Sequence, residues 1–126
     1  MTKNALVVED FKSIRLVVSN VLTKEGFNVS LAEDGLDALR FLDGTIKYSL
    51  IISDVDMPNM DGITLLKEIR KNHIYKDVPV MMLTTNTMER KKNEIQDLKI
   101  DAWVIKPFEF SAFKETIKNM VESNKI

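Results

Sequence analysis

Short apolar runs in this 126-residue chain are followed by side chains that could do chemistry. Glu9 and Asp10 come directly after the first run, and Asp54 comes directly after a later one. Thr84 and Lys106 follow two further runs. If these runs are neighbouring parallel strands, their carboxyl ends bring three carboxylates, a hydroxyl and an ammonium group to one edge of a sheet. We therefore expect a highly charged site at that edge.

This set of side chains is suited to phosphoryl transfer. Crowded carboxylates repel one another and resist ionisation unless a cation neutralises them. Oxygen ligands favour a hard cation, and Mg²⁺ typically takes one or two carboxylates together with water and phosphate oxygens. Asp54 can then act as the nucleophile, because aspartate carboxylates form aspartyl phosphates. Lys106 can bind one phosphoryl oxygen, and Thr84 can donate a hydrogen bond to a second one.

Each of these residues also has an ordinary structural explanation when it is considered alone. Asp10 could cap the helix that begins near Phe11. Asp54 and Asp61 flank a Met-Pro-Asn segment, and loops are rich in aspartate because of its role in turns. Lys106 could be a surface lysine at a strand end. Chance placement of all of them at four strand ends is improbable, at roughly one in twenty, so we prefer the functional interpretation.

Hydrophobic periodicity predicts the elements that position these side chains. Five runs have the length and composition of β-strands, namely 5–8, 27–31, 50–53, 78–83 and 102–105. Amphipathic helical patterns lie between and after them, near 14–22, 38–42, 65–69, 87–98 and 110–121. N-cap residues stand before four of these helices, at Asp10, Asp34, Asp61 and Thr87, and glycines follow two of them, at Gly26 and Gly44.

Strict alternation of strand and helix predicts one doubly wound (βα)₅ domain of the α/β class over residues 1–126. Its sheet should be parallel, with helices on both faces. The runs at Ala5, Leu50 and Val78 are the most continuously apolar, so they should be central strands, whereas the run at Phe27 alternates as an edge strand does. This pattern favours the strand order 2-1-3-4-5, one of the two common orders of doubly wound sheets.

Composition narrows the class further. The absence of cysteine excludes disulfides, zinc fingers, thiolate catalysis and cysteine-ligated iron–sulfur clusters. A formal net charge of −1 argues against nucleic acid as a direct partner. The first apolar run is too short for a signal peptide, and no run approaches the ~20 residues of a membrane span. We therefore expect a cytoplasmic protein that does not insert into membranes.

Four motifs in order resemble those of response-regulator receiver domains, and the resemblance covers essentially the whole chain. They are Val8-Glu9-Asp10, Ser53-Asp54-Val55-Asp56-Met57-Pro58-Asn59-Met60-Asp61-Gly62, Met82-Leu83-Thr84 and Val104-Ile105-Lys106-Pro107-Phe108. The resemblance implies a two-component phosphorelay in which Asp54 takes a phosphoryl group with the help of Mg²⁺. The donor would be a sensor histidine kinase, a phosphotransfer protein or a small phosphodonor.

The resemblance also implies a role for each matching residue at the site. Asp10 would be the principal Mg²⁺ carboxylate, Glu9 would assist through water, and the backbone carbonyl of Asp56 would be a further ligand beside Asp54. Thr84 and Lys106 would contact the phosphoryl group. The peptide bond from Lys106 to Pro107 would be cis.

Further implied roles concern regulation and output. Trp103 matches an aromatic position that changes rotamer together with Thr84 on activation. Asp56 and Asn86 match positions at which family members tune hydrolysis of the phosphoryl group. No effector domain follows the last predicted helix. We therefore expect output through protein contacts on the face of the fourth helix, fifth strand and fifth helix, as in stand-alone chemotaxis-type regulators or relay intermediates.

The chain departs from the family pattern at Glu9, Thr85, Lys99 and Ala102, and Thr85 stands where a small Ala or Gly is usual. Glu9 replaces the more common aspartate of the acidic pair, and its longer side chain should still reach a metal-bound water. Lys99 stands in a turn where family members often have glycine. A positive φ at Lys99 would strain the backbone; otherwise the turn has a different shape.

The main alternative is a phosphatase of the haloacid-dehalogenase type, in which Asp54 and Asp56 would form an Asp-x-Asp motif. That class wants Thr or Val where this chain has Pro58. It also needs an acidic pair after the lysine strand, whereas here Glu9-Asp10 comes before Asp54. A third interpretation is a pseudo-receiver that binds partners without phosphorylation, although every reacting residue is present. We expect a signalling switch rather than an enzyme that turns over an external substrate.

Overall fold

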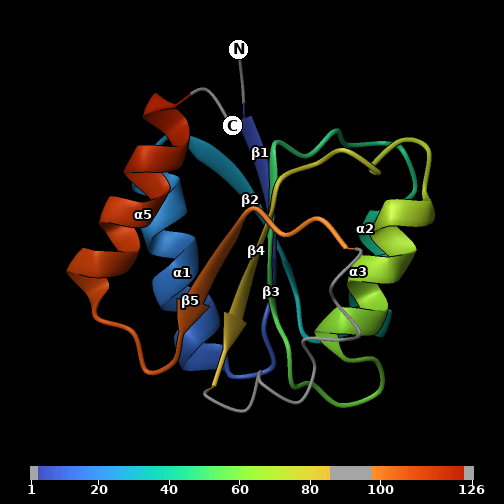
Figure 1. Cartoon of the computed structure of the whole chain (residues 1–126), viewed down its shortest axis with the longest axis horizontal. Helices are drawn as coiled ribbons and strands as arrows, with labels where there is room; N and C mark the ends of the chain where they lie inside the picture. Colours follow the sequence, from blue (N-terminus) through green and yellow to red (C-terminus); the bar gives the residue numbers. More distant parts are fainter. Residues whose placement is uncertain (1–2, 86–97, 124–126) are drawn as a thin grey trace.

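The computed structural model of this protein describes residues 3–85 and 98–123, in which strands alternate with helices (Figure 1). The strands are β1 Lys3–Val8, β2 Phe27–Ala32, β3 Leu50–Asp54, β4 Val80–Thr84 and β5 Ala102–Ile105. The helices are α1 Lys12–Lys24, α2 Gly35–Phe41, α3 Gly62–Lys71 and α5 Phe110–Glu122. The helix that the sequence predicts at 87–98 and its N-cap Thr87 fall almost entirely outside the described residues.

The five strands form one parallel sheet in the order β2-β1-β3-β4-β5, which confirms the predicted order. β1 pairs with β3 so that Val8 lies opposite Ser53. β3 pairs with β4 so that Asp54 lies opposite Leu83, and Thr84 in turn lies opposite Ile105 in β5. The strands therefore end nearly level with one another, and the residues after them meet at one edge of the sheet.

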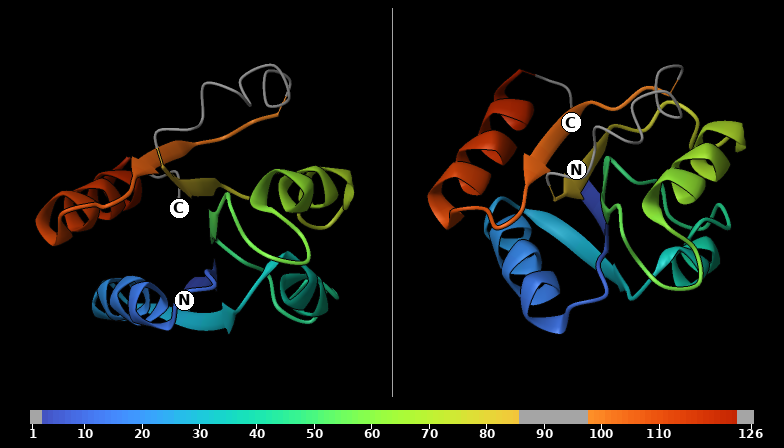
Figure 2. Two further views of the ribbon diagram at one scale, coloured as in Figure 1. Left: turned by 90° about the horizontal axis from the view of Figure 1, so that it is seen from below. Right: turned by 60° about the horizontal axis from the view of Figure 1, so that its bottom comes forward.

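Helices cover both faces of the sheet, with α1 and α5 on one face and α2 and α3 on the other (Figure 1). Figure 2 shows this three-layer arrangement from the edge at which the strands end. Side chains alternate between two cores because successive strand residues point to opposite faces. Ala5, Ile52 and Leu83 pack on the α1 and α5 side, whereas Leu6 and Ile51 pack on the α2 and α3 side. The three central strands are thus buried on both faces, as their continuous apolar runs predict.

The helix starts agree with the sequence in two cases and differ in a third. Asp34 Oδ1 accepts a hydrogen bond from the Asp37 backbone N–H at 2.8 Å, so it caps α2 as predicted. Asp61 caps α3 in the same way. The capping explanation of Asp10 is wrong, because the N-cap of α1 is Phe11 and no side chain caps that helix. Asp10 lies one residue too early to reach the first free N–H groups.

Two turns test the expectations about backbone conformation. Gly26 and Gly44 have φ values of 94° and 90°, which explains the glycine after each of the helices α1 and α2. Within 3–85 and 98–123, Asn59 is the only other residue with a positive φ. Lys99 therefore avoids the strained conformation, and the turn before β5 has a different shape from a glycine turn. No helix in the described part of the chain has the length and hydropathy that crossing a bilayer requires.

Candidate functional site

Three carboxylates meet at the edge where the strands end. Glu9, Asp10 and Asp54 each offer an oxygen, and these oxygens all lie within 4.8 Å of one another. Glu9 and Asp54 are buried, and Asp10 is partly exposed. The β1–β3 register produces this contact, because Glu9 and Asp10 follow β1 while Asp54 ends the neighbouring β3. The clustering that the sequence predicts is therefore confirmed.

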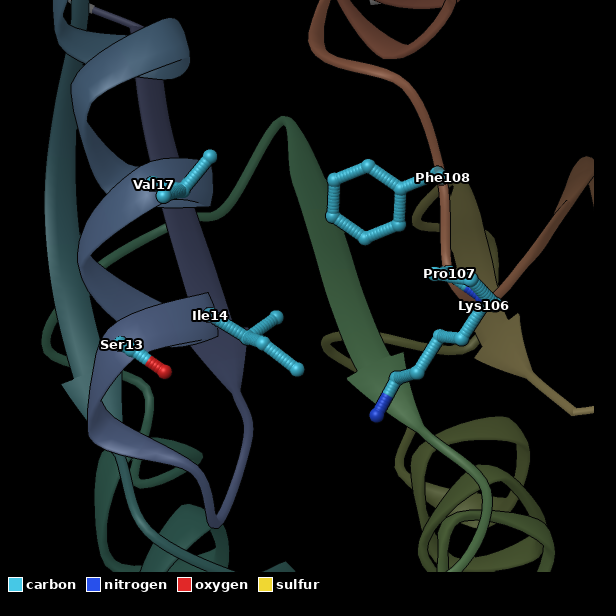
Figure 3. Close-up of a pocket in the computed structure, with 6 residues that line it drawn as sticks. All are labelled: Ser13, Ile14, Val17, Lys106, Pro107 and Phe108. Atoms are coloured by element: carbon cyan, nitrogen blue, oxygen red, sulfur yellow. The ribbon is translucent and has the colours of Figure 1, made fainter.

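Lys106 joins the cluster from the end of β5. Its Nζ lies 2.8 Å from Asp54 Oδ2 and 3.0 Å from Glu9 Oε2. Figure 3 shows its side chain extending from the β5 end toward the end of β3. The backbone positions it as well, since the Lys106 N–H donates to the carbonyl of Thr84 and the peptide bond to Pro107 is cis, as the resemblance implies. One ammonium group thus bridges two of the three carboxylates.

Burial and the contacts within the cluster shift the pKa values of these groups. It raises the pKa of Glu9 to about 7, and repulsion by Asp54 adds to this, although hydrogen bonds from Lys106 and from the Phe11 N–H act in the opposite direction. Burial also raises the pKa of Asp54, with Lys106 opposing the rise and Asp10 adding to it. Burial alone would lower the pKa of Lys106, but its hydrogen bonds to Asp54 and Glu9 outweigh that effect and raise it. The cluster holds its negative charge poorly without a further cation.

The cluster has the donors that a divalent cation needs. Its ligands are all oxygens, and Asp10 Oδ1 is a buried oxygen without a hydrogen-bond partner among the described residues. A buried polar atom without a partner is costly, and a cation bound there would remove that cost. Glu9, Asp10 and Asp54 could therefore hold a hard divalent ion between them.

Backbone contacts that the sequence does not reveal hold this site in place. Arg15 Nη1 donates to the Glu9 carbonyl at 2.7 Å, and the Phe11 N–H donates to Glu9 Oε1 at 3.2 Å. These two bonds tie the residue after β1 to the first turn of α1. Arg15 has no motif around it, so only the structure identifies its role.

The loop from β3 to α3 is held by a close approach and by a side-chain link. The Gly62 N–H donates to the Val55 carbonyl at 2.8 Å, and a Cβ at Gly62 would clash with the Asp54 carbonyl oxygen. Asn59 Nδ2 donates to Asp34 Oδ2 at 2.7 Å, which fastens the loop to the start of α2. Only glycine fits at position 62, because the backbone there lies so close to Asp54. The motif alone does not reveal this reason.

Three other predicted residues that the structure describes do not belong to this cluster of carboxylates. Thr84 is buried at the end of β4, and its hydroxyl donates to the Thr85 carbonyl at 3.0 Å. Asp56 is exposed in the loop after β3. Trp103 lies on edge strand β5 and is 39% exposed. Asn86 lies outside the described residues.

Comparison with known proteins supports a single family. Residues 5–118 match the family model described as response regulator receiver domain. Chemotaxis protein CheY-3 of Vibrio cholerae is 35% identical over 118 residues, which cover 93% of this chain and 90% of the relative. Chemotaxis protein CheY of Pseudomonas aeruginosa is 33% identical, with 93% and 94% covered.

Solved structures agree in both fold and sequence. Chemotaxis response regulator CheY4 of Vibrio cholerae superimposes with a TM-score of 0.84 at 36% identity, over 94% of this chain and 98% of that one. Response regulator TrrA from Thermotoga maritima, in complex with Mg²⁺–BeF, superimposes with a TM-score of 0.76 at 34% identity and with the same coverage of both chains. None of these matches favours the phosphatase alternative. The chain belongs to the response regulator receiver domains of two-component signalling and is of the CheY type.

Proposed function

We propose that Asp54 is the phosphoacceptor of this receiver domain. The main support is the Lys106 ammonium group, which lies 2.8 Å from Asp54 Oδ2 in a cluster of three carboxylates. A carboxylate oxygen of Asp54 would attack phosphorus while the bond to the donor breaks, giving an aspartyl phosphate. Lys106 would bind a phosphoryl oxygen, and the Thr84 hydroxyl would turn from the Thr85 carbonyl to a second one. These charged partners at Asp54 favour phosphorylation over a non-phosphorylated pseudo-receiver.

Mg²⁺ is the cofactor that we propose for the acidic cluster. Asp10 and Asp54 would bind it directly, Glu9 through water, and Asp56 through its backbone carbonyl. The supporting observations are the all-oxygen donor set and the unpartnered Asp10 Oδ1. When bound, Mg²⁺ neutralises the crowded carboxylates and the charge on the phosphoryl oxygens.

The proposed output is a switch of a protein-binding surface rather than turnover of an external substrate. When Thr84 binds the phosphoryl group, space opens beside β4, and Trp103 would rotate inward from its exposed position. This would remodel the face of β5, α5 and the helix that the sequence predicts at 87–98. Asp56 and Asn86 would set the lifetime of the phosphoryl group by orienting or admitting water.

The proposed partners follow from this chemistry. A sensor histidine kinase or a phosphotransfer protein would supply the phosphoryl group, and a downstream protein would bind the remodelled face. The receiver domain would span residues 1–126 and work in the cytoplasm, where ATP supplies such kinases.

The test is phosphorylation by acetyl phosphate with Mg²⁺, followed by intact mass. The wild type should gain the mass of one phosphoryl group, and base should remove it, as expected for an acyl phosphate. Asp54→Asn should show no gain in mass. The control is Asp77→Asn, which changes an exposed aspartate outside the site and should label like the wild type. Undiminished labelling of Asp54→Asn would place the nucleophile elsewhere.

A further inference from the structure

A pocket of about 230 Å³ lies beside the proposed phosphorylation site, between α1 and the loop that follows β5 (Figure 3). Its lining residues are Ser13, Ile14, Val17, Lys106, Pro107 and Phe108. Ile14 and Val17 come from one side and Phe108 from the other (Figure 3). The pocket opens to solvent, so a small molecule can enter it directly.

The residues that line this pocket are mostly apolar, and Ser13 and Lys106 are the polar ones among them. Val17 belongs to the apolar stripe of α1, yet it is 39% exposed. Phe108 is held in place by its ring contact with Phe113, at 5.0 Å between centroids. The pocket is therefore preformed and offers hydrophobic surface to a ligand.

Lys106 connects the pocket with the acidic cluster. Its side chain lines the pocket, while its Nζ lies 2.8 Å from Asp54 Oδ2. The distance from the pocket to Asp54 is therefore about the length of one lysine side chain. A ligand whose phosphoryl group lies at Asp54 could place a short apolar tail in the pocket. The phosphoryl group of such a ligand would lie at the Lys106 end, where the proposed Mg²⁺ would offset the carboxylates, and its alkyl group would lie at the apolar end.

We infer that this pocket binds the alkyl chain of small acyl-phosphate phosphodonors and favours butyryl over acetyl phosphate. The inference rests on the proposed function of Asp54. In the reaction, a carboxylate oxygen of Asp54 bonds to phosphorus, and the bond from phosphorus to the acyl oxygen breaks. The electron pair of that bond stays on the acyl oxygen, so the donor leaves as a free carboxylate and no proton moves.

The size of the pocket sets the expected selectivity. At about 230 Å³ it is smaller than the ~300–1,000 Å³ of sites for larger ligands, which fits a chain of a few carbon atoms. Each fully buried methylene strengthens binding about fourfold. Butyryl phosphate has two more methylene groups than acetyl phosphate, and an open pocket covers roughly half of their surface. We expect about a fourfold lower half-saturating concentration for butyryl phosphate.

The experiment measures phosphorylation of Asp54 by acetyl and butyryl phosphate at several concentrations, with Mg²⁺ present. Acetate and butyrate are leaving groups of nearly equal basicity, so a preference reports binding and not reactivity. The preference should appear in the half-saturating concentration and not in the maximal rate, because the chain contacts are the same before and during transfer. Val17→Ser should bring the ratio of the two donors toward one. Leu16→Ser, on an exposed neighbour that does not line the pocket, should keep the wild-type ratio.

The outcomes separate this inference from the proposed function. A butyryl preference that Val17→Ser reduces and Leu16→Ser retains supports the pocket assignment. Equal half-saturating concentrations in the wild type would overturn it and leave the pocket to an apolar side chain of a protein phosphodonor, while Asp54 would still be the phosphoacceptor. A preference that survives in Val17→Ser would also overturn it. Failure of both donors to label Asp54 would contradict the proposed function itself.

Discussion

Charged side chains are buried or nearly buried at both ends of the sheet, but their surroundings differ. At the amino end, Arg70 donates hydrogen bonds to the carbonyls of Lys76, Val78 and Lys99 at 3.0, 2.7 and 2.6 Å. Its Nη2 lies 3.7 Å from Asp101 Oδ2, and both side chains are less than 15% exposed, at 13% and 11%. At the carboxyl end, one ammonium group faces three carboxylates.

The difference separates a structural cluster from a functional one. The Arg70 cluster sets one cation against one anion and three carbonyls and ties α3 to the starts of β4 and β5, although Arg70 Nε has no hydrogen-bond partner among the described residues. The Asp54 cluster has an excess of negative charge and leaves Asp10 Oδ1 without a partner among the described residues. It remains destabilising until something from outside the chain binds. Perturbing each end should therefore affect stability in opposite directions.

The largest effect should follow removal of the cation at the amino end. Arg70→Met leaves Asp101 nearly buried without its ion pair and removes three hydrogen bonds, so the free energy of unfolding should fall by about 3 kcal/mol. Urea denaturation measures this change. The matched control is Arg40→Met, because Arg40 is 75% exposed and its pair with Asp37 is worth only about 0.5 kcal/mol. Equal effects of the two variants would mean that the Arg70 cluster is no more structural than a surface pair.

The second effect is a pH dependence of the free energy of unfolding, which comes from the cluster at the carboxyl end of the sheet. The pKa of Glu9 is about 7 in the folded protein, above its usual value of 4.5, so the folded state binds more protons than the unfolded state between these values. The free energy of unfolding without divalent ions should therefore fall by on the order of 2 kcal/mol from about pH 5 to about pH 8. Asp54, whose pKa is also raised, adds in the same direction.

Glu9→Gln provides the control for this pH dependence. Glutamine cannot titrate, so the fall in stability should be much shallower in this variant. Denaturation curves in matched metal-free buffers compare the two proteins. An unchanged slope in Glu9→Gln would assign the pH dependence to other groups.

Neutralising Asp10 should change the stability less than Arg70→Met does, and in the opposite direction. Asp10→Asn removes one of three mutually repelling carboxylates, so the metal-free protein at pH 8 should gain about 1 kcal/mol of stability. Asp77→Asn is the control, since Asp77 is exposed and outside the acidic cluster. A loss of stability in Asp10→Asn would show that this carboxylate supports the fold.

The sequence predicts the charged cluster at the carboxyl end of the sheet better than the one at its amino end. Period and alternation determine the strand order, and strand order alone brings Glu9, Asp54 and Lys106 together. The Arg70–Asp101 contact joins residues far apart in the chain, from a helix end and a turn that carry no motif. Side-chain contacts of this kind depend on how loops pack, which local patterns do not encode.

Two details at single residues show the same limit. Asp10 occupies an N-cap position by type, but the helix begins one residue later, so the cap assignment fails and the carboxylate faces the site. Val17 belongs to an apolar helical stripe, but periodicity indicates only the direction of a side chain. Whether another element covers it depends on the neighbouring loop, and here the pocket remains open.

The most direct test of this account is the effect of Mg²⁺ on the free energy of unfolding at pH 8. If the acidic cluster is destabilising until a cation binds, Mg²⁺ at ten times its dissociation constant should stabilise the wild type by about 1.4 kcal/mol. Asp10→Asn should lose most of this gain, while Arg40→Met should keep it. Equal stabilisation of the wild type and Asp10→Asn, or none in either, would contradict the account.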